Sequence, residues 1–159
     1  ENPGTVVALV ETLAVLKAEA VVRRMPGRWV LGSDQLLHQD GEVWGKPADS
    51  AQHLARLKAM RGRTHELVTG FALLGPGVRE VRHDITRLTV RSDLSDAELS
   101  AYVQTGEGSA CAGGYAAEGA GSFLFERIEG DFFNVLGLPL FRVMDLMREQ
   151  GWRFGAKDA

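Results

Sequence analysis

The stretch G-S-D-Q-L-L-H-Q-D-G-E-V-W-G-K-P, from Gly32 to Pro47, decides the fold of this chain because it reads as a strand, a tight turn and a returning strand. The apolar run Trp29–Leu31 before it is typical of a buried strand, and Asp34 follows where we expect that strand to end. Asp40-Gly41 is a two-residue hairpin signal. The returning strand therefore brings Lys46 back toward Asp34, and the two side chains are predicted to share one site.

A carboxylate and an ammonium group at one site suit an anionic substrate that binds together with a divalent cation. The ammonium of Lys46 can contact phosphate oxygens, while the carboxylate of Asp34 can hold a metal ion or a water molecule. The sequence does not separate these two roles of Asp34, so general base and metal ligand both stay open.

Helices and strands alternate on both sides of this hairpin. Asn2-Pro3 is a helix start, because an N-cap side chain precedes a proline at the first helical position. Apolar residues then recur at three- and four-residue steps and predict one buried face: Val6, Leu9, Val10, Leu13, Leu16 and Ala20. Lys17 lies off this stripe. A second helix is predicted over Ser50–Arg61, and a long pair of strands over Glu66–Leu74 and Val78–Arg91.

The second half of the chain continues the alternation. Ser95 and Glu98 form a capping-box signal for a short helix. Six glycines fall between Gly106 and Gly121, which predicts a loop that lets the backbone approach another group closely. A strand is predicted over Phe123–Ile128 and a final helix from Pro139 to about Gln150. This order predicts an α/β fold with a central mixed β-sheet flanked by helices.

The composition indicates an ordinary globular protein. Its 159 residues predict a single domain, 1–159, with 45% hydrophobic and 25% charged residues. The net charge of −3 argues against a nucleic acid polymer or a membrane surface as partner, but it is compatible with a free nucleotide. Cys111 is the only cysteine, so no intrachain disulfide forms, and we expect it to be small and buried. No apolar run approaches the ~20 residues of a membrane span, and a cytoplasmic location is expected.

Several blocks of this chain, in order along nearly its whole length, resemble the Maf family of nucleoside triphosphate pyrophosphatases, once described as septum-formation inhibitors. Besides the opening stretch, they are L-A-V-L-K-A (13–18), G-K-P (45–47), R-G-R-T-H-E-L-V-T-G (61–70), L-S-D-A-E-L-S-A-Y-V-Q-T-G (94–106), A-G-G-Y-A-A-E-G (112–119) and I-E-G-D-F-F-N-V-L-G-L-P-L (128–140). The family's first strand and its S-x-S-x-R-R phosphate loop have no counterpart here, and we expect the sequence to omit that segment.

The resemblance implies a Maf/ITPase-like fold and a hydrolase that converts a nucleoside triphosphate to its monophosphate and pyrophosphate with Mg²⁺ or Mn²⁺. Lys17 and Lys46 match the family's phosphate-binding lysines, and Asp34 matches its acidic residue, assigned as base or metal ligand. Cations at these places would stabilise the charge that develops on the leaving pyrophosphate. Relatives are commonly homodimers, which leaves a homodimer open for this chain.

Glu118 bears on the substrate. Family members that act on dTTP and UTP usually carry glutamine at this position, whereas relatives with glutamate and G-S-D-Q are associated with 7-methyl-GTP. A carboxylate can accept two hydrogen bonds from the adjacent N–H donors of guanine, and Trp44 could supply an aromatic face for the cationic base. The resemblance therefore favours a pyrophosphatase that acts on modified nucleotides such as 7-methyl-GTP. Two alternatives remain: a dTTP/UTP pyrophosphatase, and a non-catalytic nucleotide-binding regulator of cell division.

Three other polar residues in these blocks are assigned mainly to structure. Asp131 and Asn134 lie in a segment that resembles core and a helix entry, and His65 is expected to make a structural hydrogen bond.

Overall fold

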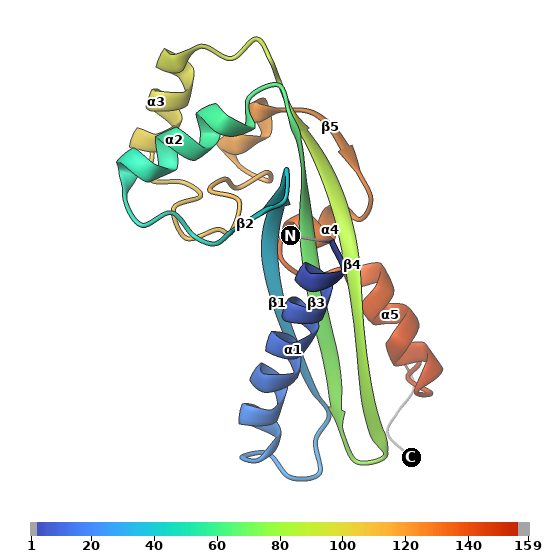
Figure 1. Ribbon diagram of the computed structural model, residues 1–159. Helices are drawn as coiled ribbons and strands as arrows, with labels where there is room; N and C mark the ends of the chain where they lie inside the picture. The colour runs from blue at the N-terminus through green and yellow to red at the C-terminus, as the bar shows by residue number, and fades with distance from the viewer. Residues whose placement is uncertain (1–2, 156–159) are drawn as a thin grey trace.

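The structure is a computed structural model that describes residues 3–155 (Figure 1). A five-stranded sheet has the strand order β2-β1-β3-β4-β5, and its long strands β1, β3 and β4 form the centre of the molecule. In chain order, the elements are α1 (Pro3–Val22), β1 (Val30–Gln39), β2 (Glu42–Trp44), α2 (Ser50–Met60), β3 (Thr64–Gly75), β4 (Val78–Val90), α3 (Asp96–Gln104), the 3-10 helix η1 (Ala120–Leu124), β5 (Phe125–Glu129), α4 (Phe132–Val135) and α5 (Leu140–Glu149).

The sheet confirms the α/β class but corrects its expected mixed character. All four strand pairs among residues 3–155 are antiparallel. Two of these pairs are tight hairpins, turning at Asp40-Gly41 and at Pro76-Gly77, and a hairpin connection can only produce antiparallel neighbours. The predicted turns are therefore right and explain two of the four antiparallel pairs. The pairs β1–β3 and β4–β5 are antiparallel as well, so the prediction of a mixed sheet is wrong for these residues.

Helix α1 lies against one face of the sheet, and the predicted buried face is right at Val6 and Val10 but wrong at Leu9, Leu16 and Ala20. The residues buried against the sheet are spaced four apart: Val6, Val10, Ala14 and Ala18. Leu9 and Leu16 are instead 42% and 55% exposed. The cause lies in the sheet, where a Cβ atom built on Gly70 would be 2.4 Å from the carbonyl carbon of Val10. At such a close approach of helix and strand, only small side chains fit between them.

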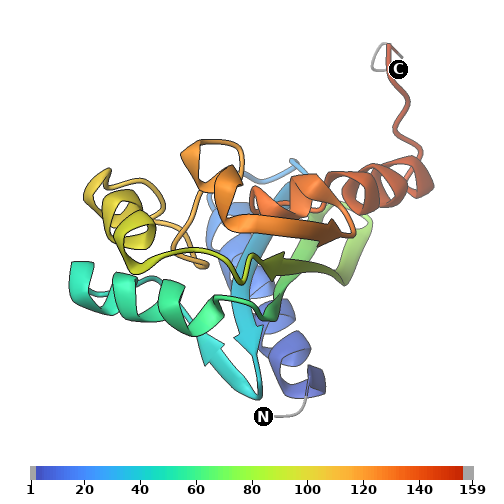
Figure 2. The ribbon, with the colours of Figure 1, turned by 90° about the horizontal axis from the view of Figure 1, so that it is seen from above.

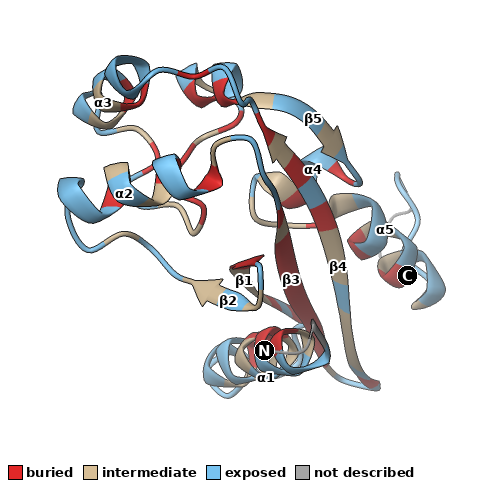
Figure 3. Ribbon diagram, turned by 45° about the horizontal axis from the view of Figure 1, so that its top comes forward, coloured by how far each residue is buried: buried red, intermediate tan, exposed pale blue. Residues whose placement is uncertain are grey.

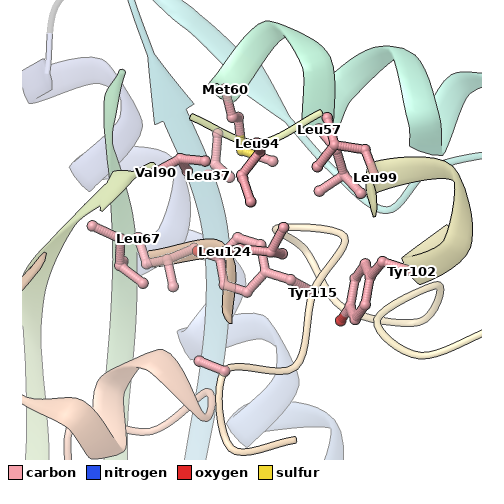
Figure 4. Packing of buried hydrophobic residues seen from close by; sticks show 12 residues of the cluster. Leu37, Leu57, Met60, Leu67, Val90, Leu94, Leu99, Tyr102, Tyr115 and Leu124 are labelled. Atoms are coloured by element: carbon pink, nitrogen blue, oxygen red, sulfur yellow. The ribbon is translucent and has the colours of Figure 1, made fainter. Parts of the chain in front are cut away.

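The opposite face of the sheet carries two further groups of helices. Helices α4 and α5 cover part of this face, and α2 and α3 extend to one side with the glycine-rich loop, as the view from above shows (Figure 2). Buried residues are concentrated along β3 and on the inward sides of α2 and α3 (Figure 3). The largest core cluster joins these helices to the sheet through residues such as Leu57, Leu67 and Leu99 (Figure 4). This core fixes the glycine-rich loop relative to the central strands.

Most other predicted elements are confirmed. Helix α2 begins after Asp49, whose side chain accepts a hydrogen bond from the backbone N–H of Gln52, and α3 begins at the predicted capping box of Ser95 and Glu98. Residues 120–124 form η1 before β5, so the predicted strand at Phe123 starts two residues later. Asn2, which we expected to cap α1, lies outside the described residues. Among residues 3–155, no helix combines the length and the hydropathy that a membrane span needs.

Candidate functional site

Asp34 lies in the middle of β1, not at the end of a strand as predicted. Its Cα atom is paired with that of Gly70 in β3, and β1 continues for five more residues to Gln39. The strand tolerates a carboxylate here because the neighbouring strand β2 pairs with β1 only from Leu37 to Gln39, so the side of β1 next to Asp34 stays accessible. The Asp34 side chain is 17% exposed.

Lys17 lies on α1, and its side chain extends to Asp34 in β1. The ammonium group donates to the Asp34 carboxylate, and this ion pair joins α1 to β1. The pair depends on the close docking of α1, because the stripe of small residues that contacts the sheet includes Ala14 and Ala18, on either side of Lys17. The structure therefore brings together Lys17 and Asp34, which the resemblance had assigned to one site.

The β1–β2 hairpin brings Lys46 back toward Asp34. Asp40 and Gly41 have φ values of 51° and 85°, as a two-residue turn with two left-handed residues requires. A pocket of about 350 Å³ opens where the chain leaves β2. Eleven residues line it: Lys17, Ser33, Asp34, Gln35, Lys46, Ala110, Cys111, Ala112, Val135, Leu136 and Gly137. The structure thus brings all three predicted charged residues together.

The pairing of its charged side chains distinguishes this pocket from two other hollows beside α1. Among residues 3–155, Lys46 has no ion-pair or hydrogen-bond partner, so its ammonium group is available to an anion. Two other hollows, of about 520 and 510 Å³, lie between α1 and the strand β4. The guanidinium groups of Arg79 and Arg23 in these hollows both already pair with Glu19. The pocket at Lys46 is therefore the better anion site.

A buried polar network holds one wall of the pocket. The Gln35 side chain donates to the hydroxyl of Thr69 at 2.8 Å and to the backbone carbonyl of Asn134 at 2.6 Å. The fully buried Asn134 side chain donates in turn to Thr86 at 3.1 Å. Asp131 caps α4 by accepting from the backbone N–H of Phe133. The structural assignments of Asp131 and Asn134 are confirmed, and the network fixes residues 135–137 beside Asp34.

The glycine-rich loop supplies the opposite wall. Cys111 is half-buried there, not fully buried as expected. Burial raises the pKa of its thiol; the negative charge of Glu118 adds to this effect and the positive charge of Lys46 opposes it. The thiol therefore lies within electrostatic reach of both side chains. His65 makes its expected structural hydrogen bond to the loop, to the hydroxyl of Tyr115, and burial lowers the pKa of its imidazole to about 4.

The two residues predicted to contact the base do not line the pocket. Glu118 is exposed on the loop beyond Cys111. Trp44 packs against the core cluster and donates its indole N–H to Glu42 at 3.1 Å. Their roles stay predictions. The sequence did not predict that Gln35 and residues 110–112 and 135–137 line the pocket. The position of Gln35 next to Asp34 was a signal, because neighbouring residues of a strand point to opposite faces and both faces of β1 can then contribute to the site.

Asp34 is the single carboxylate that lines the pocket, and the described residues contain no group of three side chains able to hold a metal ion. Mg²⁺ in nucleotide enzymes is usually bound by one or two carboxylates, with substrate phosphates and water completing its shell. One carboxylate next to two lysines fits a cation that arrives with a polyphosphate, and it does not fit a cage made by the protein alone.

The fold and this pocket define an α/β protein in which two lysines and one aspartate line one pocket. The family model of the Maf-like proteins matches residues 2–150, and the chain belongs to this family.

The chain is 42% identical over 141 residues to a dTTP/UTP pyrophosphatase of Koribacter versatilis, covering 89% of this chain and 72% of the relative. It is 40% identical over 146 residues to a nucleoside triphosphate pyrophosphatase of Nostoc punctiforme, covering 91% and 74%. It is 41% identical over 146 residues to a 7-methyl-GTP pyrophosphatase of Xanthomonas oryzae pv. oryzae, covering 91% and 76%. Relatives with different named substrates are thus about equally similar to this chain.

Proposed function

We propose that the pocket of Lys17, Asp34 and Lys46 is the active site at which this chain, a nucleotide pyrophosphatase of the Maf-like family, splits a nucleoside triphosphate into its monophosphate and pyrophosphate. The observation that carries the proposal is the ammonium group of Lys46, which has no partner among residues 3–155, in a pocket that also holds the Lys17–Asp34 ion pair. Such a pocket attracts a polyphosphate and keeps a carboxylate next to it.

The chemistry follows from the charges. Attack of water on the α-phosphate breaks the α–β bond and moves negative charge onto the leaving pyrophosphate. Lys46 and Lys17 stabilise that charge, and they act more strongly in a partly enclosed pocket than in open water. Asp34 accepts a hydrogen bond from the attacking water, orients it and can accept its proton. Before substrate binds, the ion pair with Lys17 holds the Asp34 carboxylate in place. When substrate binds, its phosphate oxygens compete with Asp34 for the Lys17 ammonium group.

A divalent cation, Mg²⁺ or Mn²⁺, belongs to this proposal as a cofactor that enters with the substrate. Asp34 would provide the protein ligand and the phosphate oxygens the others. When bound, the cation supplies further neutralisation of the phosphate charge.

Replacing Lys46 by alanine is expected to lower kcat/KM by on the order of 10²-fold, since its ammonium group meets phosphate oxygens both before and during the reaction. Lys17→Ala is expected to act in the same direction. Release of pyrophosphate from a panel of nucleoside triphosphates measures the effect. Lys58→Ala is the matched control, because Lys58 pairs with Asp96 on the surface, away from the pocket. Normal kinetics in both pocket variants would place the phosphate site elsewhere.

For the substrate, we propose 7-methyl-GTP, read through Glu118. The carboxylate is exposed on the glycine-rich loop, and its negative charge contributes to the raised pKa of Cys111 in the pocket wall. A carboxylate accepts hydrogen bonds and donates none, which suits the N–H donors of guanine and the positive charge of its methylated form. The 41% identity to a 7-methyl-GTP pyrophosphatase supports this choice.

The second candidate is a dTTP/UTP pyrophosphatase, and the 42% identity to a relative of that name favours it. In that case Glu118 would be a solvated loop residue without contact to the base. A non-catalytic regulator of cell division would bind nucleotide without turnover, which the same assays detect. The homodimer and the cytoplasmic location stay predictions.

Glu118→Gln is expected to lower kcat/KM for 7-methyl-GTP several-fold to a few hundred-fold, from the loss of ~1–3 kcal/mol of charge-assisted hydrogen bonding. The values for UTP and dTTP should hold or rise, because an amide also donates. The measurement is a comparison of 7-methyl-GTP, GTP, UTP and dTTP in both proteins. Glu126→Gln, an exposed glutamate on β5, serves as the control. An equal loss for all four substrates, or a wild-type preference for pyrimidines, would favour the second candidate.

A further inference from the structure

The glycine-rich loop has one part that forms the pocket wall and another that is anchored to the core. Residues 110–112 line the pocket. The anchored part follows at once: His53 contacts the carbonyl of Gly114, and the hydroxyl of Tyr102 accepts from the N–H of Ala116 at 3.0 Å. The wall itself is held by local turns, such as the bond from the N–H of Cys111 to the carbonyl of Gly108 at 2.9 Å. Its position therefore depends on the anchors.

Tyr115 is the central anchor. Its hydroxyl lies 2.6 Å from Nε2 of His65, and both residues are almost fully buried, at 4% and 1% exposure. The Tyr115 ring also packs edge-on against Phe125, with 4.6 Å between the ring centroids. The hydrogen bond is the polar link from this ring to β3.

The pocket wall rests directly on Tyr115. A Cβ atom built on Gly108 would lie 2.4 Å from the Cα atom of Tyr115, and one on Gly113 would lie 2.5 Å from the edge of its ring. Gly108 also has a φ of +76°, in the region that favours glycine. Gly108 and Gly113, which lie on either side of residues 110–112 in the chain, thus both pack closely against Tyr115. A displacement of Tyr115 would therefore displace residues 110–112, which form the pocket wall.

We propose that His65 and Tyr115 are positioning residues of the active site: their hydrogen bond sets the pocket wall at residues 110–112 relative to Asp34. Strand β3 is the common reference, because it carries His65 and also Gly70, whose Cα atom is paired with that of Asp34. This inference rests on the proposed function of the pocket, and it assigns neither residue a contact with substrate.

Tyr115→Phe is the first test, because it removes the hydroxyl and keeps the ring. We expect kcat/KM to fall on the order of tenfold, with changes in both kcat and KM, since a displaced wall misplaces the bound substrate. The matched control is Thr64→Val, which removes a hydroxyl bonded to Thr89 at 2.9 Å on the exposed end of the same strand. The control should keep wild-type kinetics. Assays are run well below the thermal midpoint of each variant, so a loss of stability alone does not change the rates.

A pair of variants at His65 tests the hydrogen bond itself. His65→Gln keeps an amide N–H near the position of Nε2, whereas His65→Leu removes every donor. We expect the leucine variant to lose activity as Tyr115→Phe does, and the glutamine variant to recover most of it. Equal activity in the two variants would contradict a positioning role for the bond.

The alkylation rate of Cys111 by iodoacetamide gives a readout that needs no turnover. Because this is the chain's only cysteine and it lies in the wall, its rate reports the position of residues 110–112. We expect a several-fold faster rate in Tyr115→Phe and His65→Leu, and a wild-type rate in Thr64→Val. If wild type hydrolyses no nucleotide, the proposed function fails. The alkylation rate of Cys111 still shows in that case whether the His65–Tyr115 hydrogen bond positions residues 110–112. If wild type is active and both kinetics and alkylation are unchanged in Tyr115→Phe, the inference is wrong and the proposed function stands.

Discussion

Replacing Asp34 by asparagine is expected to lower kcat by 10²- to 10⁴-fold, roughly the range that a general base contributes. Asparagine keeps the size of the side chain and an oxygen that can accept from Lys17, so the fold and the position of α1 should hold. It loses the negative charge that orients water and any cation. Nucleotide affinity should be retained or increase, because the Lys17 ammonium is no longer neutralised by a carboxylate.

The measurement is kcat under saturating Mg²⁺ together with a direct binding titration. Asp96→Asn is the matched control, because Asp96 pairs with Lys58 and Arg61 on the surface of the α2–α3 lobe. Wild-type turnover in Asp34→Asn would remove Asp34 from the reaction. Loss of binding together with turnover would instead indicate that its main role is structural.

Gly70→Ala is expected to have the largest effect on stability and to reduce activity as well. The added Cβ would lie 2.4 Å from the carbonyl carbon and oxygen of Val10, which are backbone atoms that cannot rotate away. Overpacking of this kind costs about 1–3 kcal/mol and more when the backbone must move. Since α1 has to retreat from the sheet, Lys17 should separate from Asp34, and kcat/KM should fall along with the thermal midpoint.

Gly45→Ala provides the comparison, because a Cβ atom there meets no atom within 4 Å. Its midpoint in thermal denaturation should stay close to that of wild type. If Gly70→Ala kept the wild-type midpoint and activity, the close docking of α1 would not be what places Lys17.

Features with a local cause could be predicted from the sequence. The Asp40-Gly41 turn, the Ser95–Glu98 capping box and the inward Leu57 of α2 all depend on neighbours within a few residues. The hairpin also made the convergence of Asp34 and Lys46 predictable, since strand geometry fixes where the returning chain must lie.

Features with a distant cause could not be predicted. The buried face of α1 depends on Gly32 and Gly70 in strands that follow it in the chain, so the periodicity of α1 predicted Val6 and Val10 correctly but not Ala14 and Ala18. Cys111 lines the pocket because the core holds the glycine-rich loop there, and it carries no local signal of its own. The walls of the site are thus properties of the assembled fold.

The long β3–β4 hairpin, with strands of 12 and 13 residues, bears on the order in which the chain folds. Its pairs join residues that are close in sequence, whereas β1 reaches β3 only across the whole of α2. Because closing a longer loop costs more entropy, the hairpin is expected to form before β1 and α1 dock on it. Lys17 on α1 would then reach Asp34 in the last steps of folding, and partial unfolding would dismantle the pocket while the hairpin persists.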